Sequence, residues 1–97
     1  MPLPDVGIFV PNTISPNNDG RNDKLRVLGN NIVRVQLKVF NQWGQQLFAY
    51  EGKDASVGWD GTVGGTLQPV GVYAYAVQVT LNDGRVVTKK GLFNLIR

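Results

Sequence analysis

VGVYAYAVQVTLNDGRVVTKK, residues 70–90, carries the clearest secondary-structure pattern in the chain. From Val70 to Leu81, large apolar side chains alternate with small or polar ones, which is the two-residue repeat of a strand with one buried face. Asp83-Gly84 then provides a tight turn, because glycine takes positive φ without steric cost. Val86 to Lys90 is expected to return antiparallel. The stretch therefore predicts a β-hairpin with a long central strand.

A second hairpin is predicted upstream. In Val33 to Asn41, valine or leucine at every odd position to 39 alternates with polar residues, again with a period of two. Gln42-Trp43-Gly44-Gln45 marks a turn that Gly44 supplies, and Gln46 to Tyr50 would pair back. No window shows the apolar spacing of three to four residues that is typical of an amphipathic helix.

These patterns predict the fold class all-β: an immunoglobulin-like antiparallel β-sandwich of about seven strands in one domain, residues 1–97. A small open barrel is the alternative. Residues 51–69 are rich in glycine and small polar residues and are expected to form a loop with short strands. The expected strands are Gly7–Val10, Lys24–Leu28, Val33–Asn41, Gln46–Tyr50, Val70–Leu81, Val86–Lys90 and Leu92–Ile96.

Composition excludes several classes of function. The 97 residues include no cysteine and no histidine, so thiolate nucleophiles, disulfides, zinc clusters and imidazole base catalysis are excluded. The net charge of +3 comes from scattered basic residues with no interleaved aromatic residues, which favours a solvated surface over nucleic-acid binding. No apolar run is long enough to span a membrane.

The two tryptophans each lie beside a glycine near a predicted turn. Packing is the favoured role for Trp43 and Trp59, and the alternative is an exposed indole that binds a sugar or a partner protein. In the sequence Trp59-Asp60-Gly61, Asp60 is expected to cap the turn by accepting hydrogen bonds from the amides of Gly61 and Thr62. Tyr73 is expected in the core of the long strand.

The loop PNNDGRND, Pro16 to Asp23, combines turn formers with oxygen ligands. Its spacing departs from a calcium-binding EF-hand loop, because Ser15 stands where the first aspartate belongs and Arg26 where the closing glutamate belongs. A looser calcium site stays open as an interpretation, and a self-bonded turn is favoured over it, since few carboxylates are present. The residues involved are Asn17, Asp19, the carbonyl of Arg21 and Asp23, with Gly20 as the turn glycine.

Five motifs follow one another in a recognisable order. They are VPNTISPNNDGRNDKLRV (10–27), VFNQWGQQLF (39–48), GWDGTVGG (58–65), PVGVYAYAVQV (69–79) and KKGLFNLIR (89–97). Together they cover nearly the whole chain. The chain resembles the gliding-motility-associated C-terminal domain, a type B sorting domain of the type IX secretion system in Bacteroidetes.

The resemblance implies a noncatalytic C-terminal sorting domain of a larger secreted protein, from which this chain would be an excised piece. Such a domain directs its parent protein across the periplasm and outer membrane to the cell surface or outside. The expected partner is an outer-membrane component of the translocon or a PorP/SprF-like protein. The alternative function is a carbohydrate-binding or adhesive β-sandwich module. An enzyme is disfavoured, because only carboxylates remain as acid or base.

The partner is expected to contact the last strand, because the exposed edge of a sheet can accept a strand from another chain. The alternative is that this strand completes the core, since Leu92, Leu95 and Ile96 are apolar enough to be buried. The residues predicted to take part in recognition are Lys89, Lys90, Leu92, Phe93 and Arg97.

Overall fold

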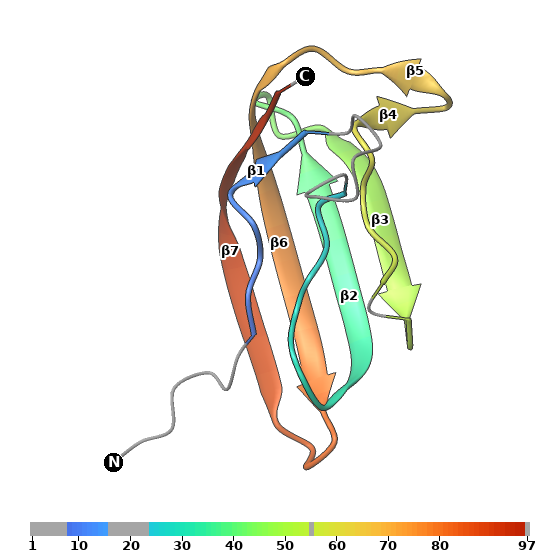
Figure 1. Ribbon diagram of the computed structural model, residues 1–97, viewed down its shortest axis with the longest axis vertical. Helices are drawn as coiled ribbons and strands as arrows, with labels where there is room; N and C mark the ends of the chain where they lie inside the picture. The colour runs from blue at the N-terminus through green and yellow to red at the C-terminus, as the bar shows by residue number, and fades with distance from the viewer. Residues whose placement is uncertain (1–7, 16–23, 55, 97) are drawn as a thin grey trace.

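Two β-layers make up the part of the chain that the computed structural model describes, residues 8–15, 24–54 and 56–96 (Figure 1). No helix occurs within these residues. The strands are β1 (Thr13–Ile14), β2 (Ile32–Phe40), β3 (Gln46–Gly52), β4 (Thr62–Val63), β5 (Thr66–Leu67), β6 (Gly71–Leu81) and β7 (Val86–Leu95).

The first layer is a five-stranded sheet of order β1-β7-β6-β2-β3. Its hairpins are antiparallel, and β1 pairs parallel to β7 through Thr13 with Asn94 and Ile14 with Leu95. The sheet runs from β1 at one edge to β3 at the other and does not close on itself. It is therefore one half of a sandwich and not a barrel.

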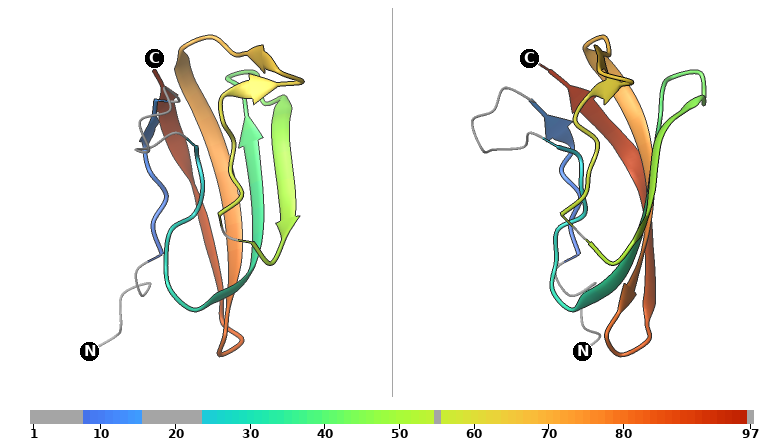
Figure 2. Two further views of the ribbon diagram at one scale, coloured as in Figure 1. Left: turned by 45° about the vertical axis from the view of Figure 1, so that its right-hand side comes forward. Right: turned by 90° about the vertical axis from the view of Figure 1, so that its right-hand side faces the viewer.

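The second layer consists of short extended segments. Phe9 and Leu28 exchange two main-chain hydrogen bonds of 2.7 Å, and Leu25 and Trp59 exchange two of 2.8 and 3.0 Å. Gly58 lets these segments approach, because a Cβ atom there would lie 2.5 Å from the carbonyl oxygen of Leu25. These segments lie over one face of the sheet, beside the small β4–β5 ribbon (Figure 2).

The core fills the space between the two layers. Odd-numbered residues of β6, β7 and the part of β2 from Val35 onward face inward, as the alternation predicts. Val33, which the alternation also placed in the core, is 45% exposed, because the register shifts between Ile32 and Arg34 and Ile32 packs against the core instead. Trp59 comes from the second layer and packs at 5.2 Å from the ring of Tyr73 and 6.0 Å from that of Phe93, measured between centroids. The most deeply buried side chains of the core are Ile14, Leu25, Val27, Val35, Leu37, Val39, Trp59, Val77, Val79, Phe93 and Leu95.

The all-β class, the sandwich and both hairpins are confirmed. Gly84 has the expected positive φ, at 89°, and Gly44, in the other predicted turn, has a positive φ of 80°. The predicted break between Val86–Lys90 and Leu92–Ile96 is wrong: Gly91 stays extended opposite Tyr75, whose ring occupies the space above it.

The strands predicted near the N-terminus differ from those observed. The segments expected at Gly7–Val10 and Lys24–Leu28 pair only through single bridges at Phe9, Leu25 and Leu28, and Gly7 lies outside the described residues. The pairing of β1 with β7 was not predicted, and it makes the sheet mixed instead of purely antiparallel.

Candidate functional site

The residues predicted to recognise a partner are divided between two faces of β7. Phe93 is only 1% exposed and belongs to the core, so its side chain is not on the folded surface and the expectation that it contacts a partner is wrong. Lys89 is half-buried on the same inward face, between Val87 and Gly91. Lys90 and Leu92 point outward from the opposite face and are exposed.

Two predicted features lie outside the described part of the chain: the recognition residue Arg97 and the loop from Pro16 to Asp23. Among the described residues, no group of three or more His, Cys, Asp or Glu side chains could hold a metal ion. The calcium interpretation rests on Asn17, Asp19, Gly20, Arg21 and Asp23, and all five lie outside the described residues.

The turn between β2 and β3 presents an indole to solvent. The side-chain Oδ1 of Asn41 accepts hydrogen bonds from the main-chain N–H groups of Trp43, at 3.0 Å, and Gln45, at 2.9 Å. This bonding, together with the positive φ of Gly44, closes the turn with the Trp43 side chain 80% exposed. The expectation that Trp43 packs is therefore wrong, whereas for Trp59 it is confirmed.

The Trp59-Asp60-Gly61 segment is structural. Asp60 Oδ1 accepts hydrogen bonds from the main-chain N–H of Thr62, at 3.0 Å, and from its hydroxyl, at 2.7 Å. The expected cap by the Thr62 amide is confirmed, but the second donor is the Thr62 hydroxyl and not the amide of Gly61. Trp59 Nε1 donates to the carbonyl oxygen of Thr62 at 2.9 Å. Gly61 has a φ of 85° and is buried, so this turn holds the tryptophan over the core.

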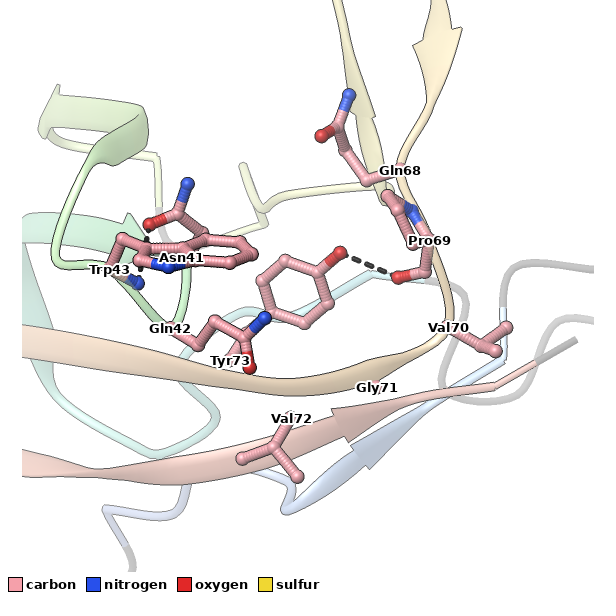
Figure 3. A pocket seen from close by; sticks show the side chains of 9 residues that line it. All are labelled: Asn41, Gln42, Trp43, Gln68, Pro69, Val70, Gly71, Val72 and Tyr73. Carbon is pink, nitrogen blue, oxygen red and sulfur yellow. Dashed lines mark hydrogen bonds between the residues drawn. The ribbon is translucent and has the colours of Figure 1, made fainter.

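A hollow of about 250 Å³ lies beside the exposed indole, at the end of the sandwich (Figure 3). Trp43 and Gln42 line it from the β2–β3 turn, Pro69 and Val70 from the segment that leads into β6, and Tyr73 from the start of β6 itself. Figure 3 shows the hydroxyl of Tyr73 donating to the carbonyl oxygen of Pro69. The hollow combines an aromatic wall with side-chain amides.

The remaining acidic side chains near turns are engaged locally. Asp54 accepts hydrogen bonds from the hydroxyl and the main-chain N–H of Ser56, and these bonds hold the pKa of Asp54 below its ordinary value. The main-chain N–H of Arg85 and its guanidinium bind Asp83 and lower the pKa of that carboxyl in the same way. Both carboxylates therefore stabilise turns.

Sequence reasoning named Lys90 and Leu92 but missed the rest of the outward face of the five-stranded sheet. Val72 and Leu92 are 51% and 66% exposed there, beside the half-buried Phe40. The sequence does carry a signal for this face, in the even-numbered positions of the strand from Val70 to Leu81. Ala74 and Ala76 are small and apolar there, whereas a solvated face would carry polar residues.

Comparisons with known proteins place this fold among secretion components. A solved structure of PorZ, described as an essential bacterial surface component of the type-IX secretion system of Porphyromonas gingivalis, is similar over 94% of this chain, with 26% identity and a TM-score of 0.59. The chain spans 12% of the PorZ chain. A comparison with curated proteins returned no match.

The sequence profile of a protein family gives the more specific result. The CHU_C Type IX secretion signal domain matches residues 8–95, which is most of the chain and includes all seven strands. The described residues contain no helix that is long and apolar enough to cross a membrane. The chain belongs to the CHU_C Type IX secretion signal domain family.

Proposed function

We propose that this chain is the noncatalytic C-terminal sorting domain of a larger protein, and that an outer-membrane component of the type IX translocon recognises its folded surface. The family match over residues 8–95 carries this proposal. A type IX secretion signal implies export through the outer membrane to the cell surface or outside. The resemblance to type B sorting domains further suggests a PorP/SprF-like protein as the direct partner.

The apolar interior of the sandwich supports recognition through surface contacts. The space between the layers is filled by apolar side chains, and the described residues include no buried polar or charged side chain. The carboxylates of Asp54 and Asp60 accept hydrogen bonds from residues of their own turns. A partner would therefore contact exposed side chains and the main-chain groups of edge strands on the outside of the sandwich.

Carbohydrate binding is the second candidate function. It is favoured by one observation, the 80% exposed Trp43 beside the hollow that Gln42 and Gln68 also line. An indole face can stack on a sugar ring, and side-chain amides can bind its hydroxyl groups.

A reporter fusion tests the sorting function. The domain is placed at the C-terminus of a fluorescent protein that carries an N-terminal export signal, in a bacterium with a type IX system. We expect the fusion on the cell surface or in the medium, and the same reporter without the domain in the periplasm. Equal export of both reporters would contradict the proposal. A domain that binds oligosaccharides in calorimetry but leaves its passenger inside would favour the second candidate.

The fusion should carry the whole domain. Removing Leu92–Arg97 would delete Phe93 and Leu95, which are 1% and 0% exposed, and would open the core. Loss of export after that truncation would report unfolding as readily as loss of a contact. Substitutions of exposed residues avoid this ambiguity.

A further inference from the structure

The outward face of the five-stranded sheet is not covered by any described segment. Figure 2 shows the second layer on the opposite side only. The strand register arranges the outward side chains in rows across β2, β6 and β7. Two neighbouring rows differ in chemistry: one is Phe40, Ala74 and Leu92, and the next is Lys38, Ala76 and Lys90.

The first row forms an apolar hollow of about 440 Å³. Ala74 lies in the middle and is small, whereas Phe40 and Leu92 on either side are large, so the row is concave. Val72 extends it toward the end of the sheet, and Val72 and Leu92 are 51% and 66% exposed. A partner side chain that filled this hollow would remove apolar surface from water on both molecules.

The second row forms a smaller hollow of about 130 Å³ with polar walls. Ala76 is its floor, and Lys38 and Lys90 lie on either side in the neighbouring strands. Gln36, Gln78 and Thr88 complete the wall. Neither lysine has a salt bridge to a described acidic residue. Two ammonium groups on either side of an alanine leave room for one carboxylate between them.

We propose that this outward face is the docking surface for the partner protein, which presents an apolar side chain to the row of Ala74 and a carboxylate to the row of Ala76. Neighbouring rows on one face lie about 7 Å apart along a strand, so the partner carries the two groups at that spacing. The proposal rests on the proposed function and adds the chemistry of the recognised surface.

A second copy of this chain is a poorer occupant than an acidic partner. Among the described strand residues of the outward face, Glu51 is the only acid, and it is paired with Arg34 at 2.7 Å. Two such faces brought together would therefore offer their lysines no free carboxylate, and the charges would repel. Charge complementarity thus favours a different protein.

Paired substitutions in the reporter fusion test the surface. Leu92→Ser removes the apolar wall, and Val86→Ser is its control, because Val86 lies on the same strand and face and is 54% exposed. Six residues, about 20 Å, separate the two sites. Lys90→Glu reverses the charge beside Ala76, and Lys53→Glu makes the same change at an exposed site after β3.

We expect Leu92→Ser and Lys90→Glu each to lower export by about tenfold or more, as substitutions at the centre of an interface do, while both control variants are exported like the unaltered domain. Circular dichroism melts of the purified domains should remain close to that of the unaltered domain. If the unaltered fusion is exported and both test variants are exported equally well, the docking surface is wrong although the sorting function stands. If the unaltered fusion is not exported, the proposed function itself fails.

The occupant is identified by crosslinking. A photoreactive benzophenone amino acid at position 92 should crosslink to an outer-membrane component of the secretion system during export, and the same group at position 86 should not. Crosslinks from position 92 to another part of the parent protein, or to a second copy, would overturn the proposal. A dimer in sedimentation of the isolated domain that Leu92→Ser dissociates would also overturn it.

Discussion

The hydroxyl group of Tyr73 donates a hydrogen bond to the main-chain carbonyl oxygen of Pro69, four residues upstream, at 2.5 Å. The bond ties the loop that follows β5 to the start of β6. It has the geometry of the tyrosine corner found in immunoglobulin-like sandwiches. The ring of Tyr73 also stacks on Phe93, its partner across β6 and β7, at 5.8 Å between centroids.

Tyr73→Phe should lower the free energy of unfolding by about 1 kcal/mol, because it removes the hydrogen bond to Pro69 and keeps the ring in the core. Tyr75→Phe is the matched control, since Tyr75 lies on the same face of β6 and makes no hydrogen bond to a described residue through its hydroxyl. Urea denaturation measures both. Equal stability of the two variants would show that the Pro69 contact contributes nothing.

Trp59→Ala should destabilise the domain by about 3 to 5 kcal/mol, because the side chain is 1% exposed and contacts two other rings. Trp43→Ala, at a site 80% exposed, should change stability by less than about 0.5 kcal/mol. Fluorescence separates the two residues: the variant that retains only Trp43 should emit at the longer wavelength. A large loss of stability from Trp43→Ala would contradict this division of roles.

Gly58→Ala should destabilise the second layer by about 1 to 3 kcal/mol, the usual range for overpacking. Its Cβ atom would lie 2.5 Å from the main-chain oxygen of Leu25 and 2.8 Å from the Cβ of Arg26, and neither is the end of a flexible side chain. The hydrogen bonds between Leu25 and Trp59 should lengthen. Faster amide exchange at Leu25 would detect this change, and unaltered exchange with unaltered stability would contradict it.

Acid should loosen the β6–β7 turn. The main-chain N–H of Arg85, followed by its guanidinium, lowers the pKa of Asp83 below its ordinary value of 3.8. A depressed folded pKa means that the contribution to stability is present above 3.8 and is lost as the pH falls through the folded pKa. The amide chemical shift of Arg85 should therefore titrate with a midpoint below 3.8, and Asp83→Asn should abolish that titration. A midpoint at or above 3.8 would show that the pKa of Asp83 is not lowered in the folded protein.

Calcium at millimolar concentration should produce neither heat in calorimetry nor a shift in melting temperature. The expectation comes from the sequence of the Pro16 to Asp23 loop, in which Asp19 and Asp23 are the only carboxylates, fewer than calcium loops commonly supply. Asp19→Asn provides the control if heat is observed. A saturable signal that this substitution removes would establish the metal site.

Strands and turns whose signals are local could be predicted from the amino-acid sequence. The alternation assigned the side chains of β6, and those of β2 from Val35 onward, to the correct faces, although it could not show the register shift that exposes Val33. Gly44 and Gly84 placed both hairpins, because a positive φ is a property of one residue and its neighbours. The same alternation predicted Tyr73 as a core residue. It could not predict that Trp59 is buried and Trp43 exposed, because both stand beside glycines. Their burial depends on whether other segments of the chain cover them.

Contacts between segments far apart in the chain could not be predicted in this way, because they depend on how the whole domain packs. The parallel pairing of Thr13 with Asn94 depends on how the two layers pack, and a strand of two residues has too short a pattern to predict. The rows that place Lys38 and Lys90 on either side of Ala76 depend on the registers of three strands at once. A sequence specifies which face each residue takes along its own strand, but the surface that a partner meets is set by the alignment of neighbouring strands.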